Sequence, residues 1–392
     1  MEKDKQVIAV ENSRSLARVE VQLGLVSKVL SDREDAFLKP KQVVLRCETT
    51  EGFKEFVVDA DIVELCLSGE NIIDLPAEIW HLNNLTELVL DNNQLTSLPK
   101  EIAQLTNLKG LYLNNNLLSN LPTEIELLTN LTELVLDNNQ LIYFPVGIGH
   151  LTNLIYLSLS TNQLISLPSE IGNLTNLTEL LLDRNQLIRL PSEIGQLTNL
   201  INITLYNNRL TSLPAEIGNL TNLKELLLYS NQLTSLPVEI GQLNNLKQLS
   251  LTSNQLTSLP VEIGKLANLR GLRLHSNQLA SLPKEIGELS NLTWLNFGRN
   301  KLISLSFEIF QLTNLVMLNL SGIQLTSLPK EIGRLNNLKW LELSNNKLTI
   351  LPKEIEQLTN LNNLDLYKNP LSNNPNERER IQTLLPKCYV TF

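Results

Sequence analysis

Few side chains in this sequence could carry out catalysis or hold a metal ion. The three histidines, His81, His150 and His275, lie far apart and lack the short spacing that metal ligands show. Cys66 falls at an expected exposed strand position, but no histidine accompanies it, and a catalytic thiol needs an activating partner. The sequence contains no Gly-x-x-x-x-Gly-Lys-Ser/Thr phosphate-binding loop. We therefore predict a protein without catalytic activity, cofactor or metal site.

Residues suited to contacts with a partner recur instead at a fixed spacing. Trp294, Met317 and Trp340 are 23 residues apart, and tryptophan and arginine are strongly enriched at the energetic centres of protein interfaces. The apolar residues could equally pack on one another, and acidic residues at such positions could simply be solvated charge. The remaining candidate contact residues are Arg273, His275, Arg299, Lys301, Tyr206, Tyr229, Glu133, Glu179 and Glu225.

This spacing comes from a 23-residue repeat that begins at Ile62 and continues almost to the end of the chain. Self-similarity at such a period is typical of a solenoid, in which each unit buries its apolar side against its neighbours. The fourteen copies begin at Ile62, Leu85, Leu108, Leu131, Leu154, Leu177, Leu200, Leu223, Leu246, Leu269, Leu292, Leu315, Leu338 and Leu361.

Each copy predicts a short strand followed by a tight return. The Leu-x-x-Leu-x-Leu segment alternates with period two, which indicates a strand with one buried face. An asparagine follows in twelve copies, and we expect its amide to bond the backbone of the turn; the exceptions are Glu70 and Ile323. In the Leu-Pro-x-Glu-Ile-Gly half, we expect proline to begin one helical or 3-10 turn and glycine to end it.

The repeated phrase resembles that of leucine-rich repeat proteins of the 23-residue Leu-Pro-x-Glu-Ile-Gly type, over residues 62–371. Intracellular Ras-pathway scaffolds, Roco GTPases and many bacterial proteins contain this type. The resemblance implies an α/β solenoid, a horseshoe with a parallel concave β-sheet and short helical or 3-10 turns on its convex side. It also implies that the concave face binds proteins and that any chemistry resides in attached domains.

The regions outside the repeats are predicted to be caps. In residues 1–61, the apolar spacing from Leu16 to Leu30 predicts an amphipathic helix, and Val43–Cys47 and Phe53–Val58 predict a hairpin. We expect this segment to shield the edge of the first strand, although it could be a separate interaction module. Residues 372–392 are predicted to form a C-terminal cap, with a helix at 376–385 and a strand after it.

Composition limits the cellular compartments and the classes of partner that we expect for the protein. The 392 residues carry a net charge of −9, which argues against general binding to nucleic acid. No stretch approaches the roughly 18–20 apolar residues of a membrane span, and no apolar signal segment follows Met1. Three scattered cysteines do not make a disulfide framework. We therefore expect a cytoplasmic protein without membrane insertion, and a monomer.

Together these patterns predict a non-catalytic scaffold, for example in signal transduction, that binds a protein on the concave face of the solenoid. One alternative is an exported bacterial effector or adhesin-like protein that binds a host protein. Another is a regulator of a small GTPase, which follows from the repeat type alone. An enzyme within residues 1–61 is the remaining alternative.

Overall fold

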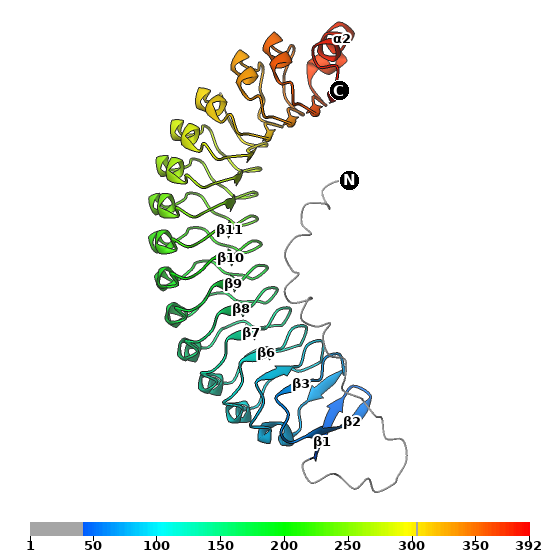
Figure 1. The fold of residues 1–392 in the computed structure, drawn as a ribbon, viewed down its shortest axis with the longest axis vertical. Coiled ribbons are helices and arrows are strands. Elements are labelled where there is room, and N and C mark those ends of the chain that lie inside the picture. The colour runs from blue at the N-terminus through cyan, green and yellow to red at the C-terminus, as the bar shows by residue number, and fades with distance from the viewer. Residues whose placement is uncertain (1–41, 303–304) are drawn as a thin grey trace.

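The computed structural model describes residues 42–302 and 305–392 and shows one curved solenoid (Figure 1). A parallel sheet of fifteen strands lines the inner side of the arc, and short 3-10 turns lie on the outer side. This is the predicted leucine-rich repeat horseshoe. The helix expected between residues 16 and 30 lies outside the described residues.

Each strand of the concave sheet contains only three residues and pairs in register with residues 23 positions away in the next repeat. The final strand, β18, comes from the segment after the repeats and pairs with β17. The fifteen strands are β3 (Glu64–Cys66), β5 (Glu87–Val89), β6 (Gly110–Tyr112), β7 (Glu133–Val135), β8 (Tyr156–Ser158), β9 (Glu179–Leu181), β10 (Asn202–Thr204), β11 (Glu225–Leu227), β12 (Gln248–Ser250), β13 (Gly271–Arg273), β14 (Trp294–Asn296), β15 (Met317–Asn319), β16 (Trp340–Glu342), β17 (Asn363–Asp365) and β18 (Tyr389–Thr391).

The convex side consists of single 3-10 turns, so it is thinner than a layer of α-helices. These turns are η1 (Ala77–His81), η2 (Lys100–Gln104), η3 (Thr123–Leu127), η4 (Val146–His150), η5 (Ser169–Asn173), η6 (Ser192–Gln196), η7 (Ala215–Asn219), η8 (Val238–Gln242), η9 (Val261–Lys265), η10 (Lys284–Glu288), η11 (Phe307–Gln311), η12 (Lys330–Arg334), η13 (Lys353–Gln357) and η14 (Pro370–Asn373).

The proline and the glycine of the return half act differently from the expectation. Proline precedes the turn with an extended backbone, as at Pro214 (φ −68°, ψ 151°), and its carbonyl accepts the N–H of Ile217 at 3.1 Å. Glycine does not end the turn, because η7 continues through Asn219. A Cβ on Gly218 would lie 2.6 Å from the main-chain oxygen of Glu239 in the next repeat. Glycine at this position therefore permits the close approach seen between these two units, although other copies place a larger residue there, such as Ala103 or Phe310.

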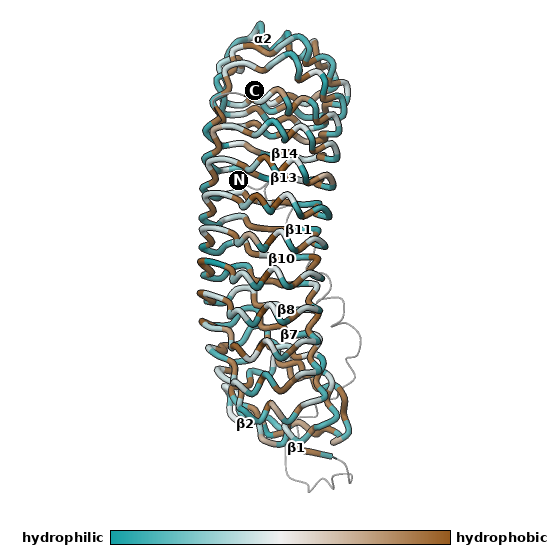
Figure 2. The backbone as a smooth tube through the Cα atoms, turned by 90° about the vertical axis from the view of Figure 1, so that its left-hand side faces the viewer, coloured by the Kyte–Doolittle hydropathy of each residue, from teal (hydrophilic) through white to brown (hydrophobic). Residues whose placement is uncertain are grey.

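The core is a continuous column of leucine and isoleucine side chains between the sheet and the outer turns. In the middle of the array Leu223, Leu226 and Leu228 have no solvent exposure. Figure 2 shows apolar residues recurring in each winding of the tube. Because every unit contributes the same side chains, burial at one repeat depends mainly on the repeats on either side.

A row of buried asparagines joins the repeats, as the sequence predicts. The Asn231 amide donates to the carbonyls of Leu205 and Leu228 at 2.8 and 3.0 Å, and its Oδ1 accepts the N–H of Leu210 at 3.0 Å. All three partners are buried backbone groups, two of them in the preceding repeat. The side chain therefore replaces the backbone partners that a tight turn would otherwise lack.

The two ends of the array are closed by different structures. Strands β1 (Gln42–Thr49) and β2 (Gly52–Asp59) form an antiparallel hairpin, and β1 pairs with β4 (Ile72–Asp74), on the return side of the first repeat. The expected contact with the edge of the first strand is thus replaced by pairing with β4, and β3 remains the terminal strand of the large sheet. At the other end lies helix α2 (Pro375–Leu384). The division of the chain at residues 61 and 371 stays a prediction.

Candidate functional site

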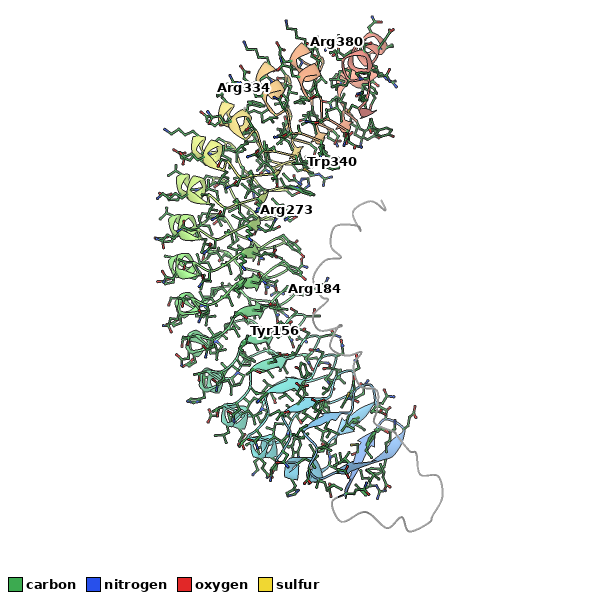
Figure 3. All side chains as sticks on the ribbon, viewed as in Figure 1. Tyr156, Arg184, Arg273, Arg334, Trp340 and Arg380 are labelled. Atoms are coloured by element: carbon green, nitrogen blue, oxygen red, sulfur yellow. The ribbon has the colours of Figure 1, made fainter. Side chains whose placement is uncertain are left out.

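Three rows of side chains line the concave face: the third, fifth and seventh residues of each repeat. Because the strands pair in register, residues at the same repeat position lie side by side, as Trp294, Met317 and Trp340 do on β14, β15 and β16. Figure 3 places Arg273 and Trp340 on this inner side and Arg334 on the outer side.

The solvent exposure of the expected stripe of Trp294, Met317 and Trp340 differs from one residue to the next. Trp340 is 43% exposed, whereas Trp294 and Met317 are half-buried. The guanidinium of Arg273, on the neighbouring β13, lies 5.2 Å from the centre of the Trp294 ring and covers part of it. The accessible part of the stripe is therefore Trp340, with Met317 beside it.

Two further aromatic residues enlarge this region, and the sequence reasoning missed both. Tyr389 on β18 pairs with Asn363 and so continues the row of Trp340; it is 70% exposed. Tyr367, at the seventh position of the last repeat, is 49% exposed. Tyr367 occupies the same repeat position as Tyr206 and Tyr229, which was a usable signal. Tyr389 lies outside the 23-residue period and gave none.

Two neighbouring side chains hold Arg273 in place. Its Nη1 donates to Gln248 Oε1 at 3.2 Å, and its guanidinium makes a cation–π contact with the Trp294 ring. Burial lowers the pKa of Arg273, while the negative charge of Glu225 partly offsets this effect. His275, at the seventh position of the same repeat, is half-buried beside it.

Arg299 and Lys301 do not lie on the sheet. Arg299 occupies the left-handed turn residue that precedes the buried asparagine, with a φ of 51°, and is exposed. Lys301 follows that asparagine on the return side, where its Nζ donates to Gln278 Oε1 at 3.1 Å. Both charges therefore border the concave face.

Tyr206 and Tyr229 form a stacked pair in the middle of the array. Their ring centroids are 4.3 Å apart and the ring planes differ by 8°. Burial raises the pKa of both phenols, and for Tyr206 the nearby Asp183 adds to the rise. The pair is a flat aromatic surface that stays neutral at physiological pH.

The predicted acidic row is less free than its sequence suggests. Glu133, Glu179 and Glu225 are half-buried, and Glu133 accepts a hydrogen bond from the Tyr112 hydroxyl at 2.8 Å. The aspartates beside this row, at the seventh position, bond groups of the following repeat. Asp183, for example, accepts from the Thr204 hydroxyl at 2.9 Å. These aspartates therefore contribute to the cohesion of the repeats.

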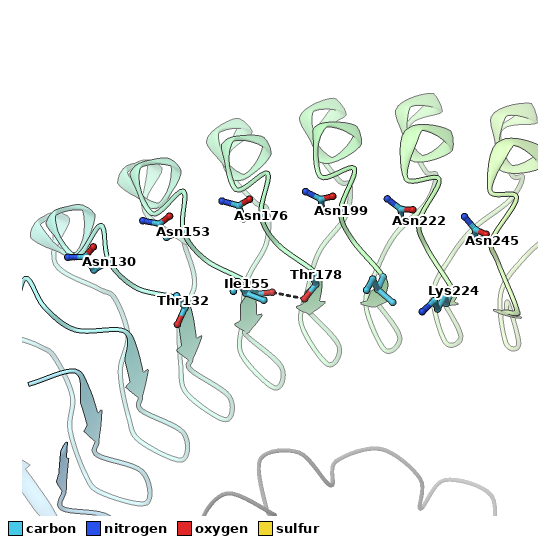
Figure 4. Close-up of a pocket in the computed structure, with 11 residues that line it drawn as sticks. Asn130, Thr132, Asn153, Ile155, Asn176, Thr178, Asn199, Asn222, Lys224 and Asn245 are labelled. Atoms are coloured by element: carbon cyan, nitrogen blue, oxygen red, sulfur yellow. Dashed lines mark hydrogen bonds between the residues drawn. The ribbon is translucent and has the colours of Figure 1, made fainter. Parts of the chain in front are cut away.

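A shallow groove of about 820 Å³ runs along one flank of the solenoid, and the sequence reasoning did not find it (Figure 4). Exposed asparagines line one side of it, each donating to a carbonyl in the preceding repeat, as Asn222 does to Thr198 at 2.9 Å. Thr178 Oγ1 in the groove likewise donates to Ile155 O at 3.1 Å. Most of its polar side chains therefore already bond the backbone, and Ile155, Ile201 and Lys224 supply the rest of the lining.

The described residues hold no group of three histidine, cysteine or acidic side chains placed to bind a metal ion. Burial raises the pKa of Cys47 to about 12 and that of Cys388 to about 11, so neither thiol ionises near neutral pH. Within the described segments, no helix has both the length and the apolar character needed to cross a membrane.

Comparison with known proteins identifies the family. A leucine-rich repeat region model matches residues 145–259, and a leucine rich repeat model matches residues 64–141 and 313–371. No curated protein matches the chain significantly.

Solved structures of other proteins share this fold. A leucine-rich repeat protein of Leptospira interrogans is 44% identical, with 85% of this chain and 96% of that chain covered and a TM-score of 0.70. An internalin of Listeria monocytogenes is 26% identical, with 86% and 89% covered and a TM-score of 0.65. A plant peptide hormone receptor, solved in complex with RGF2, is 31% identical, with 76% and 57% covered and a TM-score of 0.62. The chain belongs to the leucine-rich repeat proteins, whose fold is a common scaffold for protein–protein interaction and is typically non-catalytic.

Proposed function

We propose that this protein is a non-catalytic scaffold that binds a protein partner on the C-terminal part of its concave face. The observation that carries the proposal is the group of exposed aromatic side chains Trp340, Tyr367 and Tyr389, on or just after the last three strands of the sheet. Half-buried Met317 continues this aromatic group toward Trp294. Aromatic side chains supply large contact areas at interfaces, and these three are exposed and lie outside the core of the solenoid.

Other parts of the concave face extend the proposed contact. The Tyr206–Tyr229 stack presents a flat neutral surface in the middle of the array. Glu133 and Glu179 lie on the N-terminal side of this stack and Glu225 lies in the repeat of Tyr229, while Arg273, His275, Arg299 and Lys301 lie between the stack and the aromatic group. This distribution of charge would orient an extended partner along the solenoid. The plant receptor in complex with RGF2 is a structural precedent for a leucine-rich repeat protein with a bound partner.

Affinity capture with matched variants tests the proposal. The double variant Trp340→Ala/Tyr389→Ala removes side chains that are 43% and 70% exposed. The control Phe307→Ala/Tyr143→Ala removes aromatic side chains that are 45% and 68% exposed but lie outside the concave sheet. A partner captured by the wild type and the control, and lost with the double variant, supports the assignment. Equal capture by all three proteins contradicts it.

We place the protein in the cytoplasm as a monomer with a role in signalling. The three cysteines are not paired with one another, which suits a reducing compartment. Cell fractionation and size-exclusion chromatography test the compartment and the oligomeric state. Recovery of the protein from the culture medium or the cell surface would favour an exported effector or adhesin instead.

A further inference from the structure

Arg273 is an unusual feature of the concave face because its charge is partly removed from water, while the negative charge that acts on it comes from Glu225, two strands away. Among the described residues, no Asp or Glu oxygen lies within 4 Å of its guanidinium. The neighbouring residues in its row, Ser250 and Asn296, are neutral. Burying part of a charge is costly unless an opposite charge accompanies it, and the charge of Glu225 offsets only part of that cost. A carboxylate in direct contact with the guanidinium would complete the site.

The neighbours of Arg273 fix its position. Gly271 has no side chain, and a Cβ there would collide with the Gln248 carboxamide, which occupies that space. Gln248 Oε1 in turn accepts the hydrogen bond from Arg273 Nη1 at 3.2 Å. On the opposite side, the Trp294 ring lies 5.2 Å from the guanidinium carbon. An arginine held in this way has already lost much of its side-chain freedom, which lowers the entropic cost of binding.

The indole N–H of Trp294 has no hydrogen-bond partner in this arrangement. Trp294 Nε1 is buried and has no hydrogen-bond acceptor in the described part of the chain. An unpaired buried donor is unfavourable, so the ring is not in this position for its own hydrogen bonding. What this position provides is the cation–π contact of the ring with the guanidinium. That contact uses none of the guanidinium N–H groups, so those not bonded to Gln248 are available to a carboxylate.

We infer that Arg273 binds a carboxylate of the protein partner, from an aspartate or glutamate side chain. The inference rests on the proposed function, since it names the chemistry that the concave face recognises. Arginine matches a carboxylate with two parallel hydrogen bonds, a geometry that lysine lacks.

The position of Arg273 also specifies a spacing in the partner. Trp340 lies three strands away from Arg273 and two residues along the strand direction. With strands ~4.8 Å apart and ~3.3 Å per residue, the separation is roughly 16 Å. An extended segment covers that length with four or five residues. The partner segment should therefore carry its acidic residue four or five positions from the apolar residue that contacts Trp340.

Selection of peptides tests this inference with the full-length protein. A displayed library of random 12-residue peptides is selected on the wild type after depletion on Trp340→Ala/Tyr389→Ala, so that concave-face binders remain. The affinities of synthetic versions are then measured on the wild type and Arg273→Gln. We expect an Asp or Glu in the selected peptides, and its change to Asn or Gln should weaken binding to the wild type about tenfold or more. On Arg273→Gln the same change should have less than a twofold effect.

Each other outcome has a defined meaning. If the peptides depend on Trp340 but need no carboxylate, or if removal of the carboxylate weakens binding equally on both proteins, the inference about Arg273 is wrong and the proposed function stands. If depletion leaves no binding peptide, the proposed function fails and the inference fails with it. Gly271→Ala and Gln248→Ala, which displace or remove the support of Arg273, should each weaken binding while leaving the carboxylate requirement in place. An unchanged thermal midpoint of Arg273→Gln shows that the loss is not caused by unfolding.

Discussion

Replacement of Asn231 by alanine should destabilise the solenoid far more than replacement of Asn222, although both are asparagines of adjacent, nearly identical repeats. Asn231→Ala removes a side chain that bonds three buried backbone groups, Leu205 O, Leu228 O and Leu210 N. Leaving a buried backbone group unpaired costs about 1–3 kcal/mol. Because some of the three groups can find water after local relaxation, we expect a loss of about 3–5 kcal/mol in the free energy of unfolding.

Asn222→Ala is the matched control. Asn222 is exposed and makes a single hydrogen bond, to Thr198 O at 2.9 Å, which water can replace. We expect its loss to cost less than about 1 kcal/mol.

Denaturant unfolding followed by circular dichroism compares the midpoints of the two variants, and hydrogen exchange reports on the site itself. The Leu210 amide, which bonds Asn231 Oδ1, should exchange much faster in Asn231→Ala and remain protected in Asn222→Ala. Because a long array need not unfold in one step, the exchange measurement is the more direct of the two. Equal midpoints and equal protection of Leu210 in the two variants would refute the role assigned to the buried row.

Three other substitutions test the remaining structural arguments. Leu226→Ala empties a fully buried position and should cost about 2–5 kcal/mol, measured by the same denaturant titration. Gly218→Ala should destabilise by about 1–3 kcal/mol although alanine favours helical turns, because its Cβ meets the Glu239 backbone; a rise in thermal midpoint would contradict this. Burial raises the pKa of Asp137 to about 6. Its ionisation therefore opposes folding, and stability should fall as the pH rises from about 4 to 6. Asp137→Asn should flatten that part of the pH profile and stabilise the protein at pH 7 by up to about 2 kcal/mol, as urea midpoints at both pH values would show.

The regular positions of the repeat were sufficient to predict the fold, since each acts through its nearest neighbours in the array. A leucine at a strand position and an asparagine at the turn have the same surroundings in every copy, so one copy describes the others. Glycine was misassigned because its constraint comes from the backbone of the next repeat, as Gly218 and Glu239 show. Nothing within a single repeat distinguishes that close contact from the end of a turn.

The candidate site was less predictable because it depends on residues that do not repeat. The row of Trp294, Met317 and Trp340 followed from the 23-residue period, but the different exposure of the two tryptophans did not. Arg273 covers part of the Trp294 ring from another row, which the period cannot indicate. Tyr389 was missed because its strand joins the sheet after the repeats have ended.

The exceptions to the asparagine row, Glu70 and Ile323, share one conformation. In the regular repeats one residue of the turn has a positive φ, whereas these two repeats have a pair, Gly69 with Asn71 and Gly322 with Gln324. In both, the next asparagine accepts two backbone N–H groups through its Oδ1: Asn93 accepts from residues 70 and 72, and Asn346 from residues 323 and 325.

This shared geometry has a physical explanation at the start of the array and a consequence near its end. Each asparagine of the row donates to a backbone carbonyl in the preceding repeat. Residue 70 belongs to the first repeat, so an asparagine there would have no preceding repeat to supply that carbonyl. The repeat of Ile323 has the conformation of a first repeat, which means that the row ends at Asn300 and begins again at Asn346. A recess of about 330 Å³ lies at this junction. Strand pairing between β14 and β15, backbone hydrogen bonds such as that from Arg299 N–H to Ser321 O, and leucine packing still connect the two repeats there. Arg273 and Trp340 lie on opposite sides of it. A partner that contacts both therefore bridges the junction, and its binding adds a connection between repeats at the place where the asparagine row has none.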